Sequence, residues 1–347
     1  MNWDTFSKNR SILMGFSIIL IVVFHWCENY KLFQITPLKG ILGNIVWSFI
    51  DKIAWIGMCG VEIFLFLSGI GLYFSFTNKN NIKNFYIKNF IKILIPYFFI
   101  AIPYLIWQNF FFKERGIIYF FADLSLATTF TTFNRQSWYV AMILLMYLIF
   151  PFIYYLRKNY SRILIFLLIF SIIFPWIIQE MDVSLFNKIQ IMLTRIPIFI
   201  FGVYCGKYVY EKKEMVYFPL SIVALGILTH IIFLLQKLNG IRTTVILRYE
   251  KALIILIILI VLIYLFEKFP LSRLKKLFLW FAPITLELYL THVEIRRIFS
   301  RLIKSDWNFL SVTIAFLIII VVSIPISVYV HKISKKYIDI LSKKMIM

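Results

Sequence analysis

The chain has 347 residues, of which 61% are hydrophobic and 19% aromatic, and its mean hydropathy is +0.86. A soluble domain is about 45–50% apolar, so this composition excludes a soluble globular protein and predicts an all-α, polytopic membrane helix bundle. The formal net charge of +21 does not indicate a nucleic-acid-binding protein, because the basic residues cluster in short loops between apolar runs.

Ten segments are apolar and long enough to cross a bilayer, which takes about 20 residues. They are 11–30, 54–76, 89–110, 138–156, 162–178, 191–210, 216–235, 251–267, 278–295 and 308–331. The first follows Lys8 and Arg10 and lacks a small-residue cleavage site, so we interpret it as an uncleaved helix rather than a signal peptide. The stretch 116–133 is also apolar, but Asp123 and a run of threonines interrupt it. This favours an interfacial or re-entrant segment over an eleventh span.

The loops between the predicted spans set the expected topology. With the N-terminus and the C-terminus in the cytoplasm, more than half of the lysines and arginines fall on the inner side, as the positive-inside rule requires. Topology does not explain an excess of outer arginines, namely Arg242, Arg248, Arg296, Arg297 and Arg301. The polar gaps are too short for a soluble domain, so we predict a single integral-membrane domain over 1–347. The predicted spans indicate a multi-pass protein, which we expect in the plasma membrane, and the lysine- and isoleucine-rich composition is typical of an AT-rich bacterial genome.

Ionisable side chains inside a span are costly, and they usually face a cavity or a partner. Four of the ionisable residues in the predicted spans are candidates for such a role, namely His25, Glu62, Glu287 and His292. A histidine beside a carboxylate is the usual composition of a general-base site, because the carboxylate fixes the tautomer and stabilises the imidazolium. Since His25 and Glu62 fall at matching depth, we expect them to form a catalytic pair. The alternative is that each group satisfies a polar neighbour inside the bundle.

The sequence around the remaining two histidines gives less support for a catalytic role. His230 has no acidic residue in its own predicted span, so we interpret it as a packing residue or a polar bridge between helices. His331 lies among lysines at the cytoplasmic end of the last span, where an interfacial role is expected.

Two further groups of residues lie near the expected membrane interfaces. Lys88 and Lys92 are four residues apart, so they share one helical face and could bind a polyanion. The alternative is contact with anionic lipid headgroups. Arg135 precedes Trp138 and Tyr139 at the start of a span. Taken alone, these three residues are typical of an interfacial anchor.

Five stretches, taken in order and spacing, resemble the integral-membrane acyltransferase 3 family. They are "MGFSIILIVVFH", "GVEIFLFLSGIGLYFSF", "KNFIKILIPYF", "SWYVAMILLMYLIFP" and "TLELYLTHVEI", and the resemblance covers about residues 10–330. Members of this family are multi-spanning O-acyltransferases that act on cell-surface polysaccharides, lipopolysaccharide, peptidoglycan or related glycans. The resemblance therefore implies an acyl-CoA-dependent membrane enzyme, most simply an O-acetyltransferase.

The resemblance also implies roles for the residues singled out above. His25 would take the proton from a sugar hydroxyl or carry the acetyl group itself, and Glu62 would orient it. Cytoplasmic acetyl-CoA would be the donor, with its phosphates held by Lys88, Lys92 and Arg10. The acceptor side would be lined by Trp138, Tyr139, His292, Glu287 and Arg135.

One position departs from the family pattern. The family usually has a basic residue directly before the first-helix glycine, and this chain has Met14 there. Arg10 lies one turn earlier on nearly the same face, so we expect it to substitute. The cysteines have no metal-ligand spacing, and the resemblance implies no permanently bound cofactor. The expected partners are acyl-CoA, a glycan or lipid-linked glycan acceptor and membrane lipids, and not nucleic acid.

Two other functions remain open from the sequence. A transporter or flippase for a lipid-linked sugar would also have intramembrane charges and many spans. Against it, interrupted spans do not recur at corresponding positions in two halves of the chain. An acyltransferase for a small cytoplasmic or lipid acceptor is the third possibility.

Overall fold

A computed structural model describes residues 2–32, 40–79, 81–134, 137–300 and 308–346. In these ranges every named element is a helix, which confirms the all-α prediction. The elements are α1 Asp4–Lys8, α2 Arg10–Leu32, α3 Ile41–Gly57, α4 Gly60–Lys79, α5 Ile82–Ile106, the π-helix η1 Trp107–Phe112, α6 Ile117–Leu124, α7 Ala127–Thr131, α8 Trp138–Asn159, α9 Ser161–Met181, α10 Val183–Leu193, α11 Ile196–Tyr210, α12 Phe218–Leu238, α13 Thr244–Lys268, α14 Ser272–Phe281, the 3-10 helix η2 Ala282–Ile284, α15 Thr285–Phe299 and α16 Phe309–Ile346.

Nine segments of the described chain are long and apolar enough to cross a membrane, whereas we predicted ten. The prediction of a span over 278–295 is wrong. Helix α14 ends at Phe281, the short 3-10 turn contains Pro283, and α15 starts afresh at Thr285. Fifteen residues of α15 extend about 22 Å, which is less than the hydrocarbon thickness of about 30 Å.

The boundary of the second predicted span also needs correction. The apolar segment Gly43–Lys79 contains two helices, α3 and α4, separated by a turn at Met58 and Cys59. We expected one span over 54–76 and no separate helix before it. Helix α3 escaped prediction because polar residues interrupt its apolar pattern every three or four positions.

The apolar stretch 116–133 does not form a membrane-crossing helix. It contains α6, of eight residues, and α7, of five. Helices of these lengths extend about 12 Å and 8 Å, so neither crosses a bilayer. The favoured interpretation of this stretch as something other than an eleventh span is consistent with these lengths.

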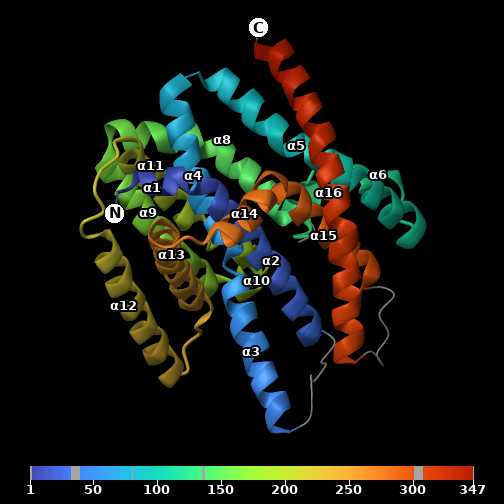
Figure 1. Ribbon diagram of the computed structural model, residues 1–347, viewed down its shortest axis with the longest axis horizontal. Coiled ribbons are helices and arrows are strands. Elements are labelled where there is room, and N and C mark those ends of the chain that lie inside the picture. Colours follow the sequence, from blue (N-terminus) through green and yellow to red (C-terminus); the bar gives the residue numbers. More distant parts are fainter. Residues whose placement is uncertain (1, 33–39, 80, 135–136, 301–307, 347) are drawn as a thin grey trace. The chain divides into compact units, whose positions relative to one another are not determined.

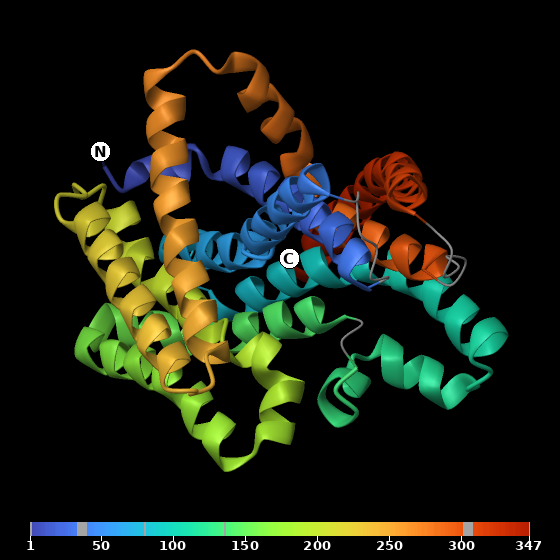
Figure 2. The same ribbon diagram turned by 90° about the horizontal axis from the view of Figure 1, so that it is seen from below.

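The chain folds as two compact units, each built from separate parts of the sequence. Unit 1 comprises 1–14, 61–85 and 141–279. Within it, α12 and α13 lie side by side, as both ribbon views show (Figures 1 and 2). Helices α4 and α11 approach closely at Gly69 and Gly202, where a Cβ on Gly69 would lie 2.6 Å from the carbonyl oxygen of Phe199. Small residues at such crossings let helix backbones approach within a membrane.

We expect Gly202→Ala to destabilise unit 1, because its new Cβ would overlap the carbonyl oxygen of Phe66 on α4. Overpacking of this kind costs about 1–3 kcal/mol. The melting temperature of the detergent-purified protein measures the effect. Gly226→Ala on α12 is the matched control, since its Cβ would meet only Ile257 at 3.7 Å. Equal melting temperatures for the two variants would contradict the close helix approach.

Unit 2 comprises 15–60, 86–140 and 280–347. In it, α3 packs antiparallel along α2. The Ser17 hydroxyl donates a hydrogen bond to the carbonyl of Gly60, and a Cβ on Gly57 would lie 2.7 Å from the Leu20 carbonyl oxygen. Further along α2, Cys27 packs in a core cluster with α3 and α16, formed by Ile50, Ala54 and Val312. Helix α15 lies beside α16 in the same unit (Figure 1).

Candidate active site

His25 lies in a charged cluster between α2 and α15 of unit 2. Its Nδ1 is 2.9 Å from Oε2 of Glu28, one turn further along α2. Arg296 of α15 places Nη1 2.8 Å from the same carboxylate oxygen and 3.0 Å from His25 Nδ1. Its Nε donates to Oδ1 of Asn29 at 2.7 Å. One carboxylate oxygen therefore joins the imidazole and the guanidinium, and the amide of Asn29 fixes the guanidinium from the other side.

Two tautomers of His25 fit these contacts, because Nδ1 can donate to Glu28 Oε2 or accept from Arg296 Nη1. Glu28 Oε2 can accept hydrogen bonds both from Arg296 Nη1 and from Nδ1 of the imidazole. With its proton on Nδ1, the ring leaves the Nε2 lone pair available to accept a proton. A histidine oriented in this way by a carboxylate is the usual arrangement of a general base, and positive charge formed on the ring would lie next to Glu28.

A second imidazole lies beside the first. The ring centroids of His25 and His292 are 5.2 Å apart, and His292 is fully buried. His292 Nδ1 is bonded to the backbone carbonyl of Leu288, which assigns its proton to Nδ1. Its Nε2 is buried and has no hydrogen-bond partner in the described part of the chain. Such a nitrogen is an acceptor available to a substrate group.

Aromatic rings continue from His292 to a residue that we assigned to the acceptor side. The ring centroids of Tyr289 and His292 are 6.1 Å apart, and those of Tyr139 and Tyr289 are 5.0 Å apart. Trp138 lies next to Tyr139 with a centroid distance of 6.0 Å. These rings connect the start of α8 to α15. Arg135, the remaining residue of that predicted group, lies outside the described residues.

Arg195 is a partner of Glu62 that the sequence did not predict. In unit 1 its Oε1 lies 3.0 Å from Nε of Arg195, and both side chains are almost completely buried. The carboxylate that contacts His25 is Glu28, because Glu28 is three residues away on the same helix and faces the same side. Within unit 1 Glu62 thus forms a buried ion pair with Arg195, and because His25 lies in unit 2, the pairing of His25 with Glu62 stays a prediction.

The remaining histidines and Glu287 also have partners. His331 Nδ1 lies 2.9 Å from Oε1 of the buried Glu287, so His331 is more than the interfacial residue we expected. This bond ties α16 to α15 within unit 2. His230 lies 2.8 Å from Glu250 of α13, which agrees with the interpretation as a polar bridge between helices.

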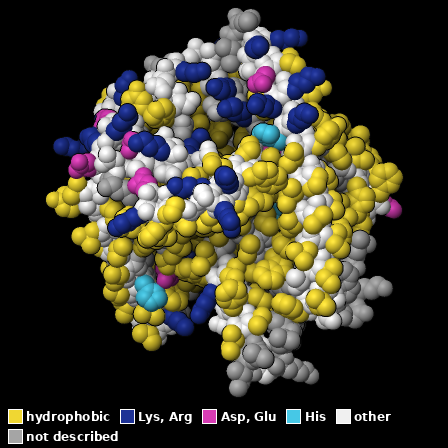
Figure 3. Space-filling model, viewed as in Figure 1, with side chains coloured by type: hydrophobic (Ala, Val, Ile, Leu, Met, Phe, Trp, Pro, Cys, Tyr) yellow, Lys and Arg dark blue, Asp and Glu magenta, His cyan; other side chains and the backbone are white. Residues whose placement is uncertain are grey.

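The basic residues assigned to the donor lie on separate elements. Lys88 and Lys92 are one turn apart on α5, and Phe99 of that helix contacts Tyr337 of α16 at 5.8 Å. This contact brings α5 close to α16 at Tyr337, and lysines precede and follow Tyr337 on α16, namely Lys332, Lys335, Lys336, Lys343 and Lys344. Basic side chains gather around this end of α16 in Figure 3. In unit 1, the guanidinium of Arg10 lies against Gly71 of α4.

A histidine held by a carboxylate and an arginine within apolar helices has the composition of an acyl- or proton-transfer site. A family model described as "Acyltransferase domain" matches residues 12–332. The chain belongs to the acyltransferase 3 family. No curated protein and no solved structure matches it. As a member of this family the chain is a multi-pass membrane acyltransferase, which requires an acyl donor and an acceptor.

Sequence reasoning on this acyltransferase missed Glu28 and Arg296. Glu28 lies near the outer end of the first predicted span, where an acidic residue is unremarkable. Arg296 was one of the outer arginines that topology left unexplained, and that excess was the available signal.

We expect Glu28→Gln to lower the rate of acyl transfer by this acyltransferase about 10- to 100-fold. Glutamine keeps the shape but removes the charge that fixes the His25 tautomer and stabilises its protonated form. The rate should fall at saturating donor and acceptor while both KM values stay within about twofold. The matched control is Glu294→Gln, because Glu294 bonds Arg297 on its own helix rather than His25. Similar rate losses for the two variants would contradict a positioning role specific to Glu28.

Proposed function

We propose that this acyltransferase is an O-acetyltransferase that moves an acetyl group from cytoplasmic acetyl-CoA to a hydroxyl of a cell-surface polysaccharide or its lipid-linked precursor. The observation that carries the proposal is the cluster of His25, Glu28 and Arg296, in which the Glu28 carboxylate can hold the His25 proton on Nδ1 so that Nε2 acts as the base. Acyl transfer to a hydroxyl needs a base that accepts the hydroxyl proton, and this cluster can supply one.

The reaction can be written on the residues of unit 2. Nε2 of His25 removes the hydroxyl proton as the hydroxyl oxygen attacks the thioester carbonyl. The carbon–sulfur bond then breaks, and the CoA thiolate takes up the proton from the imidazolium. Alternatively, His25 attacks the thioester first and carries the acetyl group to the hydroxyl. In both routes Glu28 stabilises the positive ring, and the free Nε2 of His292 can accept a hydrogen bond from the acceptor.

The donor side is assigned to the basic surface of α5 and α16. Lys88, Lys92 and the lysines of the C-terminal part of α16 would bind the phosphates of acetyl-CoA. This surface would face the cytoplasm if both termini are inside, as the positive-inside rule favours. Trp138, Tyr139, His292 and Glu287 are proposed to shape the acceptor side, and the protein would reside in the plasma membrane.

Membrane vesicles that contain the protein and its glycan acceptor test the proposal. Acetyl-CoA labelled in the acetyl group is added on the side that carries the lysines of α16, and label is then measured in the glycan. We expect label in base-labile ester linkage, because O-acetyl esters are hydrolysed by mild base. Unchanged acetyl-CoA together with movement of lipid-linked sugar across the membrane would instead identify a flippase.

A further inference from the structure

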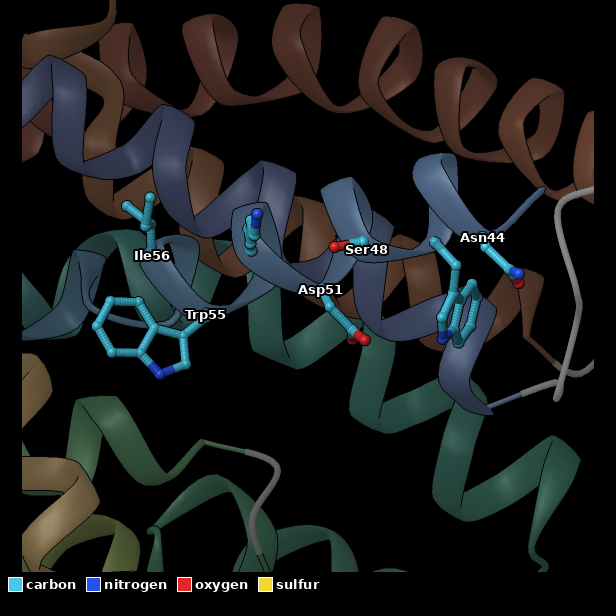
Figure 4. Close-up of a pocket in the computed structure, with 7 residues that line it drawn as sticks. Asn44, Ser48, Asp51, Trp55 and Ile56 are labelled. Carbon is cyan, nitrogen blue, oxygen red and sulfur yellow. The ribbon is translucent and has the colours of Figure 1, made fainter. Parts of the chain in front are cut away.

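An open pocket lies along one face of α3, in the same unit as His25. Its volume is about 660 Å³, within the range of about 300–1,000 Å³ typical of small-molecule sites. The lining residues are Asn44, Trp47, Ser48, Asp51, Lys52, Trp55 and Ile56 (Figure 4). None of them belongs to the cluster around His25, and the proposed reaction assigns them no role.

The lining combines two large rings with short polar groups. Trp47 and Trp55 are eight residues apart, which corresponds to about 12 Å along the helix. Between them a hydroxyl, a carboxylate and an ammonium group line the pocket, and the amide of Asn44 precedes Trp47 by three residues. In Figure 4 the Trp55 ring and the Asp51 carboxylate project to the same side of α3. Indole rings cover the apolar faces of sugar rings, while such polar groups exchange hydrogen bonds with sugar hydroxyls.

The packing of α3 on α2 places one end of the pocket at the depth of His25. Gly57 packs against Phe24, the residue before His25, and Ala54 packs in the cluster that contains Cys27. Trp55 lies between Ala54 and Gly57 in sequence, so it has the same depth as His25. The rest of the pocket extends from there towards the N-terminal end of α3.

The charge of the pocket argues against binding of the other substrate, acetyl-CoA. Asp51 and Lys52 contribute one charge of each sign, so the lining has no net positive charge to hold the phosphates of CoA. The lysine-rich part of α16 has that charge instead. A lipid acyl chain would offer no hydrogen bond to the polar groups of Asn44 and Ser48, which is costly. An uncharged sugar segment matches both the rings and the polar groups.

We propose that this α3 pocket binds the sugar residues of the acceptor glycan that adjoin the hydroxyl presented to His25. The proposal rests on the proposed function, since it assumes that the acceptor is a glycan. It assigns to α3 the recognition of the acceptor and leaves the chemistry to α2 and α15. Bound sugars at Trp55 would hold the reacting hydroxyl at the depth of His25 rather than at the donor surface.

Kinetics with separated substrates test the pocket. The probe is surface glycan purified from cells that lack the gene, titrated into vesicles with labelled acetyl-CoA. We expect Trp47→Ala and Trp55→Ala to raise the KM for the glycan about tenfold, which corresponds to about 1.4 kcal/mol. The KM for acetyl-CoA should not change, which also shows that the variants are folded. Asp51→Asn, which keeps the side-chain shape, should raise the glycan KM severalfold.

Phe49→Ala is the matched control, because Phe49 is on α3 and 61% exposed but does not line the pocket. Its glycan KM should equal that of the wild type. Unchanged glycan KM values in the tryptophan variants, or a rise in the acetyl-CoA KM alone, would overturn the pocket assignment. If the proposed function itself were wrong, the wild-type protein would place no label in the glycan, and this result distinguishes the two failures.

Discussion

In vesicles that contain the His25→Ala variant, acetyl transfer to the glycan is expected to fall at least about 10³-fold, while the protein remains inserted in the membrane. A positioned general base contributes about 10²- to 10⁴-fold, and a residue that carried the acetyl group would be needed absolutely. The measurement is the initial rate of label transfer at saturating acetyl-CoA and glycan. Immunoblotting of the membrane fraction gives the amount of protein for normalisation.

His230→Ala is the matched control for this loss. His230 also lies on a long apolar helix and is also paired with a glutamate, Glu250, at 2.8 Å. A histidine that only bridges helices should be replaceable with less than a fewfold change in rate. If both variants retained transfer, or both lost it equally, the assignment of the chemistry to His25 would fail.

Arg195→Met is expected to destabilise the protein by about 3–5 kcal/mol. The guanidinium of Arg195 is 4% exposed, and its removal leaves the 7% exposed carboxylate of Glu62 as an unpaired buried charge. Removing both charges together is much less harmful, since buried ion pairs replaced by uncharged residues are often close to neutral. The double variant Glu62→Gln with Arg195→Met should therefore recover most of the lost stability.

The stabilities are compared by thermal unfolding in detergent for four proteins: the wild type, Glu62→Gln, Arg195→Met and the double variant. We expect a low melting temperature for Arg195→Met and a melting temperature closer to that of the wild type for the double variant. Additive effects of the two substitutions would mean that Glu62 and Arg195 do not interact. The acetyl-transfer rate of the double variant tests the expected catalytic role of Glu62. Loss of transfer by a folded double variant would support that role, and full activity would contradict it.

The sequence predicted the class of fold because apolar composition and span length depend on the bilayer rather than on tertiary contacts. A prediction based on apolar composition and span length fails at short helices, because their boundaries depend on tertiary contacts. Helix α3 has a polar face that conceals its apolar one, and Pro283 divides an apolar run that looked like one span. Whether an apolar run crosses the membrane depends on where it breaks, and only the three-dimensional fold shows that.

The site was predicted in part. His25 and His292 were identified because an imidazole within an apolar span is unusual, and the structure brings their rings together. Their charged partners were not identified, since depth along a helix says little about direction around it. Glu62 matched His25 in depth, yet Glu28 contacts it. Arg296, which completes the cluster, comes from a helix 271 residues away in sequence, a pairing that no local pattern encodes.

The ester content of the cell-surface glycan shows whether this protein acetylates that glycan through His25. It is measured by nuclear magnetic resonance, or as acetate released by mild base, in cells with the gene, without it, and complemented by the wild type or by His25→Ala. We expect the O-acetyl esters to disappear on deletion, to return with the wild-type gene and not to return with His25→Ala. Unchanged ester content after deletion, or full restoration by His25→Ala, would contradict this expectation.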